Sequence, residues 1–270
     1  MPELPEVETT RRGIKPYIDQ QIITQVIVRQ TKLRWPVPVE IKQMEGQEVE
    51  SVTRRGKYIL IETPAGTALI HLGMSGSLRI VDAGTEPEKH DHIDIVLDSG
   101  KAVRMRDPRR FGAFLWTTQN PLKHKLIRYL GPEPLTDDFN ADYLYQASRG
   151  RSMSIKQFIM TGQVVVGVGN IYACESLFKT GISPKWSAGK VSKERYAKLV
   201  EEIKIVLANA IEQGGTTLRD FVQVGGSPGY FAQQLNVYGR KGESCLQCGS
   251  EIKQITQGQR STFYCAKCQH

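Results

Sequence analysis

Two groups of residues in this 270-residue chain have types and spacings suited to chemistry, its first residues and four cysteines near its end. The chain begins Met1-Pro2-Glu3, and removal of Met1 would leave Pro2 as a secondary amine. An unprotonated amine is a nucleophile toward carbonyl and sugar carbons, and the Glu3 carboxyl group could transfer protons beside it. An ordinary initiator methionine and a Pro5 that opens a helix explain the same residues, so the rest of the chain must decide between these two interpretations.

A helix is predicted directly behind this start. Apolar residues recur there at spacings of three, seven and four, as on the core-facing side of a helix: Leu4, Val7, Ile14 and Ile18. Pro2 would then stand at a helix N-terminus, where the helix dipole disfavours protonation of its amine.

The cysteines form two C-x-x-C pairs, Cys245 with Cys248 and Cys265 with Cys268, separated by sixteen residues. This spacing predicts a four-cysteine zinc site, and four thiolates leave no open position for a substrate, so the zinc would be structural. Segments 251–256 and 260–264 predict a β-hairpin with Arg260 beside its tip, either as a passive part of the module or as a phosphate contact. The fifth cysteine, Cys174, lies in an apolar helical pattern and is expected to be buried.

Basic and apolar side chains gather in two predicted turns. Residues 104–112 (RMRDPRRFG) place four arginines and an aromatic residue between two strands. An arginine and a phenylalanine presented together, as Arg109 and Phe111 are, suit insertion into a duplex. Met74 lies at the apex of the other turn, residues 71–76. Both apolar residues are more commonly core residues, and their position in turns favours the DNA-facing interpretation.

Four further residues have open roles. Lys57, at the start of a strand, is either a solvated lysine or a cation for phosphate or catalysis. His90 and His92 flank Asp91 without a third metal ligand nearby, so they do not predict a metal site. Asn170 follows Gly-Val-Gly at a helix start and is either an N-cap or a phosphate donor.

Composition favours a polyanionic partner. The formal charge is +8 with a pI near 9.2, and the basic residues are spread through the chain, which indicates nucleic acid first and an anionic membrane second. Hydrophobic content of 40% and charged content of 24% are typical of a globular protein. No apolar run approaches the roughly 18 residues of a membrane span and no leader opens the chain, so we expect a cytoplasmic protein without membrane contact.

The pattern of elements predicts an α+β multidomain chain. Residues 1–130 would form a β-sandwich or barrel behind the leading helix, from strands at 22–28, 49–53, 58–62, 68–72, 77–81, 93–97, 102–105 and 111–116. A stiff Gly-Pro-Glu-Pro connector marks a linker at 131–137, ahead of a helical domain at 138–235 and a finger at 236–270. Helices are expected at 142–148, 154–160, 170–179 and 193–213.

The segment 161–169 joins two of these helices tightly and predicts a helix-turn-helix-like pair whose amides could hold phosphates. Residues 216–230 predict a glycine-rich loop. Its Gly225-Gly226-Ser227-Pro228-Gly229 run matches the G-x-S-x-G pattern of serine hydrolases, but a helical segment precedes it and proline occupies the turn, so that match is rejected.

Taken together, these motifs resemble those of the bacterial formamidopyrimidine-DNA glycosylases. The resemblance is carried along the whole chain by PELPEVET at 2–9, DPRRFG at 107–112, GVGNIY at 167–172 and the finger with Arg260. It implies an N-terminal β-sandwich, a helix-two-turn-helix domain, a zinc finger with one structural zinc, and a monomer that acts on damaged duplex DNA. The implied activity is excision of oxidised purines such as 8-oxoguanine, followed by strand cleavage.

The resemblance also implies roles for single residues. Pro2 would attack the sugar C1′ to form an iminium, Glu3 would donate a proton, Lys57 would assist β-elimination and Arg260 δ-elimination. The gap left by the flipped nucleotide would be filled by Met74, Arg109 and Phe111, with Arg109 reading the orphaned cytosine. The DNA track would be lined by His71, His90, Arg151 and Asn170, while Lys156 and the loop at 216–230 would lie near the extruded base.

Two alternatives remain from the sequence. An endonuclease VIII-type glycosylase shares the proline, the helical pair and the finger but prefers oxidised pyrimidines. Leu4 and the set of Met74, Arg109 and Phe111 look like the purine-specific branch. A non-catalytic zinc-ribbon protein that binds DNA would account for the charge and the finger and would leave the Pro2-Glu3 start unexplained.

Overall fold

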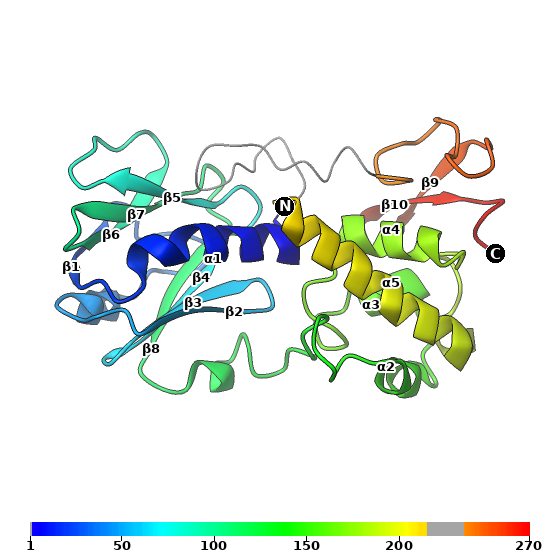
Figure 1. The fold of residues 1–270 in the computed structure, drawn as a ribbon, viewed down its shortest axis with the longest axis horizontal. Coiled ribbons are helices and arrows are strands. Elements are labelled where there is room, and N and C mark those ends of the chain that lie inside the picture. Colours follow the sequence, from blue (N-terminus) through cyan, green and yellow to red (C-terminus); the bar gives the residue numbers. More distant parts are fainter. Residues whose placement is uncertain (1, 215–234) are drawn as a thin grey trace. The chain divides into compact units, whose positions relative to one another are not determined.

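The structure, a computed structural model, describes residues 2–214 and 235–270. The chain divides into two compact units, of which the first runs to Tyr129 and the second comprises Leu130–Glu212 and the C-terminal segment to His270. Figure 1 labels the elements along the chain. The predicted loop at 216–230, with its G-x-S-x-G run, lies outside the described residues.

The leading helix is present as α1, Leu4–Ile18. Its N-cap is Glu3, Pro5 lies in its first turn, and the predicted apolar stripe is buried: Leu4, Val7, Ile14 and Ile18. The carboxylate of Glu8 on this helix accepts hydrogen bonds from Arg11, Arg12 and Arg54 at 2.7–3.1 Å. Because Arg54 belongs to a strand of the sandwich, this cluster ties the helix to the sheet.

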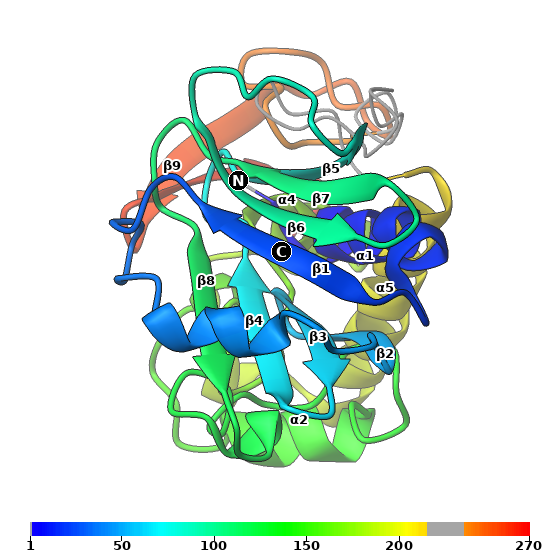
Figure 2. The same cartoon turned by 90° about the vertical axis from the view of Figure 1, so that its left-hand side faces the viewer.

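All eight predicted strands are present: β1 Ile23–Val28, β2 Ser51–Arg55, β3 Tyr58–Thr63, β4 Gly66–His71, β5 Ser77–Asp82, β6 Asp91–Leu97, β7 Lys101–Arg106 and β8 Ala113–Thr117. They form two four-stranded antiparallel sheets with the orders β1-β6-β7-β5 and β2-β3-β4-β8. The sequence left a sandwich and a barrel open, and two separate sheets make this unit a sandwich (Figure 2).

Each open side of the sandwich has a cover. On one side α1 contacts the edge strands β2 and β5, and on the other a 3₁₀ helix at Val39–Met44, which the sequence did not predict, contacts β1, β4 and β8. A single apolar cluster fills the space between the sheets with residues from both, among them Val26, Ile70 and Phe114, and with Ile14 of α1. Because α1 contributes to this cluster, the helix that follows Pro2 and Glu3 is anchored in the core.

The prediction that four arginines share the turn at 104–112 is wrong for two of them. Arg104 and Arg106 lie on β7, and Arg104 is only 3% exposed. Its guanidinium forms two hydrogen bonds with Asp94, at 2.9 and 2.8 Å, and Asp94 also accepts one from Arg29. A buried arginine needs such a carboxylate partner, so Arg104 serves the sheet and not a ligand.

The second unit contains the four predicted helices, α2 Ala141–Ser148, α3 Ile155–Ile159, α4 Asn170–Lys179 and α5 Lys193–Glu212. Short 3₁₀ helices lie at Pro121–Lys123 in the first unit and Ala188–Lys190 in the second. The helix α4 packs against α3 and α5 and is buried along most of its length, and the predicted apolar face of α5 is buried too.

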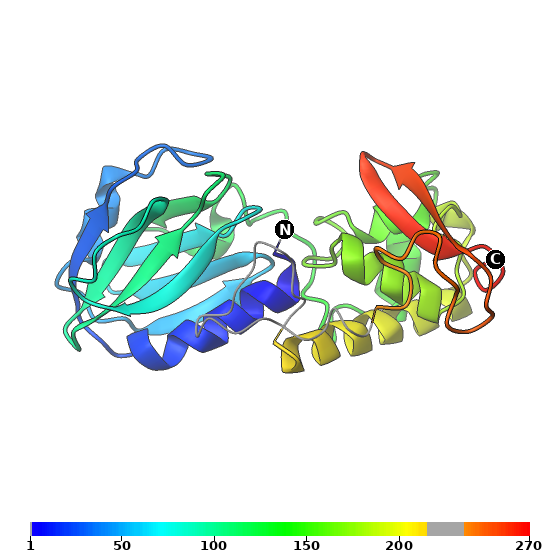
Figure 3. The same ribbon diagram turned by 90° about the horizontal axis from the view of Figure 1, so that it is seen from above.

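The predicted hairpin is formed by β9, Ile252–Gln257, and β10, Arg260–Cys265. It lies beside α4 (Figure 3), and Cys174 and Phe178 of that helix share an apolar cluster with Val237, Ile252 and Phe263. Burial of Cys174 is therefore confirmed. The finger and the helices belong to one compact unit.

Candidate functional site

Pro2 and Glu3 stand directly in front of α1, and both are buried. The backbone of Glu3 is held at two points. Its N–H donates to the Glu6 carboxylate at 2.8 Å, and its carbonyl accepts from the Val7 N–H at 3.1 Å. The start of the helix therefore positions Pro2, and the dipole of α1 acts against a positive charge on its nitrogen.

A lysine and a histidine lie at the end of the sheet where β2 turns into β3 and β4 ends. Lys57 occupies the two-residue turn between β2 and β3, and the next residue, Tyr58, pairs in register with His71 of β4. The Tyr58 and His71 rings are 4.9 Å apart between centroids. The β2–β3 turn and the end of β4 therefore place a cationic and an imidazole side chain at one end of the sheet.

His71 is a neutral side chain near pH 7. Burial, with the positive charges of Lys57 and Arg34, lowers its pKa from 6.5 to about 4. The Gly73 N–H donates to its Nδ1 at 3.0 Å, so in the neutral ring the proton is on Nε2. His71 can thus offer one N–H to an anion without adding charge.

Met74, Arg109 and Phe111 lie in two turns that touch through their backbones. A Cβ on Gly73, whose φ is +67°, would lie 2.4 Å from the Phe111 carbonyl carbon. Only glycine permits this approach, so the two turns form one surface. Phe111 is 42% exposed, and the Arg109 guanidinium carbon lies 5.0 Å from its ring centroid. An exposed aromatic ring with a cation beside it is the geometry that the sequence predicted for a wedge.

His90 lies in the connection that precedes β6 and has φ of +79°. Its carbonyl accepts the Asp107 N–H at 3.1 Å, and the buried His92 bonds the Asp107 carbonyl through Nε2 at 2.8 Å. His92 therefore has a structural partner, while His90 keeps a partly exposed ring beside the Arg109 turn.

In the second unit, Asn170 joins α3 to the hairpin. Lys156 of α3 donates to Asn170 Oδ1, and Asn170 Nδ2 donates to the Ser261 carbonyl at 2.8 Å. The N-cap interpretation of Asn170 is wrong, because Gly169 caps α4 and Asn170 is its first helical residue. Lys156 is 0% exposed, whereas Arg260, beside Ser261 at the tip of the hairpin, is exposed. Arg151 is exposed as well.

A buried carboxylate on the same helix holds the chain where it enters the finger. Glu175 accepts hydrogen bonds from the N–H groups of Asn236, Val237 and Tyr238, each at 2.8–2.9 Å. Its second bond to Asn236, from Nδ2, is 2.9 Å long. A carboxylate is a strong acceptor for three successive backbone N–H groups. Glu175 therefore fixes the segment that leads into the finger to α4.

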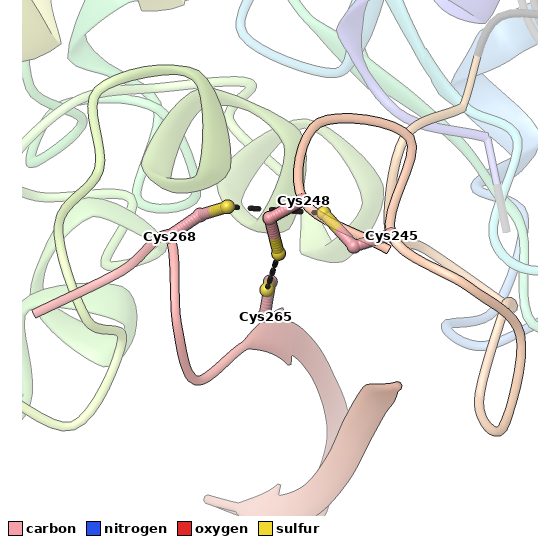
Figure 4. Close-up of side chains that lie close together, drawn as sticks. All are labelled: Cys245, Cys248, Cys265 and Cys268. Carbon is pink, nitrogen blue, oxygen red and sulfur yellow. Dashed lines mark hydrogen bonds between the residues drawn. The ribbon is translucent and has the colours of Figure 1, made fainter. Parts of the chain in front are cut away.

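The four finger cysteines converge (Figure 4), with all four sulfurs within 4.8 Å of one another. Sγ–Sγ distances are 3.8 Å for Cys245–Cys268 and 3.5 Å for Cys248–Cys265. A tetrahedral zinc with Zn–S bonds of about 2.3 Å separates its sulfurs by about 3.8 Å, so the arrangement fits this ion. Burial and the three neighbouring thiols raise the pKa of Cys268, so its thiolate form is disfavoured. A divalent cation bound by the four sulfurs would stabilise the thiolate.

Three family models match consecutive parts of this chain. Residues 1–114 match the formamidopyrimidine-DNA glycosylase N-terminal domain, and residues 130–222 match the H2TH domain of the same glycosylase. Residues 242–270 match the zinc finger found in FPG and IleRS. The third match agrees with the four clustered sulfurs and identifies the finger as a zinc site holding one ion.

Relatives agree over their full length. The formamidopyrimidine-DNA glycosylases of Stutzerimonas stutzeri (strain A1501) and Pseudomonas aeruginosa (strain LESB58) are 58% and 59% identical over 270 residues, covering 100% of both chains in each case. The chain belongs to the formamidopyrimidine-DNA glycosylase family. The family resemblance inferred from the Pro2-Glu3 start, the Arg109 turn and the finger is thereby confirmed.

Solved structures of this glycosylase family share the fold. The MutM (Fpg) protein of Thermus thermophilus superimposes with a TM-score of 0.89 at 34% identity, covering 99% of this chain and 98% of that one. A complex of Lactococcus lactis Fpg with DNA containing an abasic site gives 0.91 at 31% identity, covering 99% of both chains. The predicted fold class is confirmed.

Three buried carboxylates of this glycosylase escaped the sequence reasoning. Glu6 and Glu175 look like ordinary helix glutamates, although each buries its carboxylate to bind backbone N–H groups: Glu6 that of the candidate residue Glu3, and Glu175 those where the chain enters the finger. Asp107 stood inside the 104–112 turn without a role of its own. For Asp107 and Glu175 the only signal was an acidic residue in an otherwise basic or apolar stretch, whereas Glu6 stands among other glutamates. In the part of the chain that the structure describes, no helix is long and apolar enough to cross a membrane.

Proposed function

We propose that this chain excises oxidised purines from duplex DNA, with Pro2 as nucleophile, and then cleaves the strand at the abasic site. The observation that carries the proposal is the buried Pro2-Glu3 pair in front of α1 in a member of this glycosylase family. Lactococcus lactis Fpg has been solved with DNA containing Fapy-dG derivatives and an abasic site, which supports the substrate class.

In this mechanism the Pro2 nitrogen attacks the sugar C1′, and the base leaves with the electrons of the glycosidic bond. Glu3 supplies a proton at the sugar, so that the ring opens and an iminium joins Pro2 to C1′. The iminium withdraws electrons and acidifies the C2′ hydrogen, whose loss expels the 3′ phosphate in β-elimination. We assign assistance of this step to Lys57 and assistance of the later δ-elimination, which expels the 5′ phosphate, to Arg260.

A base inside a duplex shields C1′, so the nucleotide must leave the stack at a cost of a few kcal/mol. We propose that Met74, Arg109 and Phe111 offset that cost by filling the gap, with Arg109 hydrogen-bonding the cytosine left behind. The exposed pairing of Arg109 with the Phe111 ring supports these roles.

We further propose that His71, His90, Arg151 and Asn170 contact the DNA backbone. The neutral His71 ring would donate its Nε2 proton to a phosphate. For Lys156, burial of the whole side chain and its bond to Asn170 support an indirect contribution through Asn170, in place of the contact near the extruded base that the resemblance implies. Such a protein would act as a monomer on damaged DNA in the bacterial cytoplasm, as the chain's positive charge and its bacterial relatives support.

The test is reduction of the imine. Borohydride added during reaction with an 8-oxoguanine duplex should link wild-type protein covalently to DNA. A Pro2→Gly variant, which replaces the proposed nucleophile, should be compared with Pro5→Ala, which alters a proline in the helix and keeps Pro2. Intact-mass measurement must first show that Met1 is absent, because a retained Met1 leaves an amide at Pro2. Absence of an adduct from active, Met1-free protein would refute the mechanism.

The duplexes should include an oxidised pyrimidine, since a complex of Lactococcus lactis Fpg with DNA containing an oxidised pyrimidine is known. We expect faster excision of 8-oxoguanine than of the pyrimidine. The reverse order would favour the endonuclease VIII-type alternative and leave the Pro2 chemistry intact.

A further inference from the structure

Asp107 places a completely buried carboxylate beneath the two turns that carry Met74, Arg109 and Phe111, the wedge residues. Its side chain is 0% exposed. Oδ2 accepts the backbone N–H of Gly112 at 2.7 Å, next to Phe111, and Oδ1 accepts the hydroxyl of Ser75 at 2.9 Å, next to Met74. One carboxylate therefore binds both turns, one through each oxygen.

Ser75 extends this link to the arginine. While its hydroxyl donates to Asp107, its oxygen accepts the backbone N–H of Arg109 at 3.2 Å. A hydroxyl has one proton to donate and lone pairs to accept, so both bonds form at once. The Arg109 N–H, the Ser75 hydroxyl and the Asp107 carboxylate therefore form a continuous hydrogen-bonded relay.

The backbone of Asp107 anchors the relay to the strands. Its N–H donates to the His90 carbonyl at 3.1 Å, and its carbonyl accepts from Arg110 N–H at 3.2 Å and binds His92 Nε2 at 2.8 Å. Space around the relay is tight, because a Cβ on Gly112 would lie 2.9 Å from Asp107 Oδ2. The two turns consequently have little freedom to shift against each other.

We infer that Asp107 and Ser75 are positioning residues that hold Met74, Arg109 and Phe111 in the arrangement needed to replace a flipped nucleotide. Neither residue touches DNA in this scheme, since both are buried. The inference rests on the proposed function, because it concerns the part of that function that empties and refills the stack. A displacement of about 1 Å in such a set is enough to lower a rate by about 100-fold.

The test compares two reactions of the same protein. Excision of 8-oxoguanine from a duplex needs the wedge, whereas β-elimination at an abasic site in single-stranded DNA has no base to extrude and no orphaned cytosine to read. Ser75→Ala should lower the single-turnover excision rate by about 10- to 100-fold and reduce the preference for cytosine opposite the lesion. Its lyase rate on single-stranded abasic DNA should stay within about twofold of wild type, because that reaction does not require the positioned turns.

Thr63→Val is a matched control. Thr63 is also buried and its hydroxyl donates to the Gly66 carbonyl at 3.0 Å, but at the opposite end of the β3–β4 hairpin from His71. It should leave the duplex rate and the opposite-base preference unchanged. A second variant, Asp107→Asn, offers one oxygen to two donors, and adding Ser75→Ala to it should lower the duplex rate by less than the product of the two single effects.

The outcomes separate the two ideas. If wild-type protein excises 8-oxoguanine and Ser75→Ala matches it in rate and opposite-base preference, the positioning role is overturned and the proposed function stands. Equal losses on duplex and single-stranded substrates would also overturn it, because they show general damage to the fold. If wild-type protein excises nothing, the proposed function fails and the positioning role fails with it.

Discussion

The side-chain amide of Asn170 donates to the backbone carbonyl of Ser261 at 2.8 Å, so the first turn of α4 is bonded to the hairpin residue that follows Arg260. The same amide accepts from the buried Lys156. A single side chain therefore joins α3, α4 and β10, and the exposed Arg260 is held through its neighbour.

Asn170→Ala should destabilise the second unit. It removes partners from a buried ammonium and a carbonyl, which we expect to lower the free energy of unfolding by about 1–3 kcal/mol. Urea denaturation measures the free energy of unfolding, and hydrogen exchange of the α4 amides locates the loss in the second unit. Gln254→Ala is the control, because Gln254 also contacts Ser261, through its hydroxyl, but is exposed and should cost less than about 0.5 kcal/mol. Equal costs for the two variants would contradict a central role for Asn170.

Salt dependence distinguishes Lys57 of the β2–β3 turn from His71 of β4. Lys57→Gln should reduce the slope of log K against log salt by about 0.9, the value for one lost phosphate neutralisation. His71→Gln should weaken binding at pH 7.5 without changing this slope, because the His71 pKa of about 4 leaves the ring neutral. Titrations with an abasic-analogue duplex measure both. A slope change for His71→Gln equal to that of Lys57→Gln would show a charged imidazole.

Arg109→Ala should weaken discrimination between cytosine and adenine opposite the lesion by about 1–3 kcal/mol, because it removes the guanidinium that we propose hydrogen-bonds the cytosine edge. Arg110→Ala is the control in the same turn. Both arginines are exposed, but only Arg109 lies over the Phe111 ring. Single-turnover rates on the two duplexes give the ratio, and an unchanged ratio in Arg109→Ala would count against base reading.

Metal analysis should find one zinc per chain. Cys248→Ser removes one of four converging ligands and should lose the metal together with DNA binding, since the hairpin and Arg260 depend on the finger. Cys174→Ala changes the one cysteine outside the cluster and should retain zinc. Folded, active wild-type protein without metal is the result that would refute a structural zinc.

Acid should loosen α1 from the sandwich. Burial raises the pKa of Glu8, but hydrogen bonds from Arg11 and Arg12 and the charges of Arg11 and Arg54 outweigh it and lower the pKa from 4.5 to about 2. A lowered pKa stabilises the fold fully above pH 4.5, and this contribution disappears as the pH falls toward 2. It amounts to about 2–3 kcal/mol.

The measurement is the free energy of unfolding between pH 4.5 and 2. Glu8→Gln should lack this part of the pH dependence, whereas Glu50→Gln, at an exposed glutamate, should follow the wild-type curve. Parallel curves for wild type and Glu8→Gln would exclude the Glu8 cluster as its source.

Local sequence patterns were sufficient for the elements of this fold. Short β-branched runs broken by turns predicted all eight strands of the sandwich, 3.6-residue apolar patterns predicted the five α-helices, and cysteine spacing predicted the finger. Each of these signals lies within a short segment, so it can be recognised without knowing which other segments pack against it. The 3₁₀ helix at Val39–Met44 was missed, since six residues are too few to show a period.

What the tertiary structure decided was the partner of each polar side chain. The sequence determined that Pro2 and Glu3 precede a helix and that Arg104, Arg109 and Phe111 are close along the chain. It could not determine that Arg104 is buried against Asp94 while Arg109 faces outward, because that depends on where β7 ends and which strand lies beside it.

The same holds for the acidic residues that organise the site. Asp107, Glu175 and Glu6 look like surface carboxylates in sequence, yet each is buried against backbone N–H groups. For Glu175 these amides come from a distant part of the chain, and Asp107 binds the Ser75 hydroxyl of the other turn in addition to the Gly112 N–H. Hydrogen bonds between such distant segments leave no periodic trace along the chain. The sequence by itself therefore determined the chemistry available to this protein, and only the folded arrangement decided which side chains present it and which hold them in place.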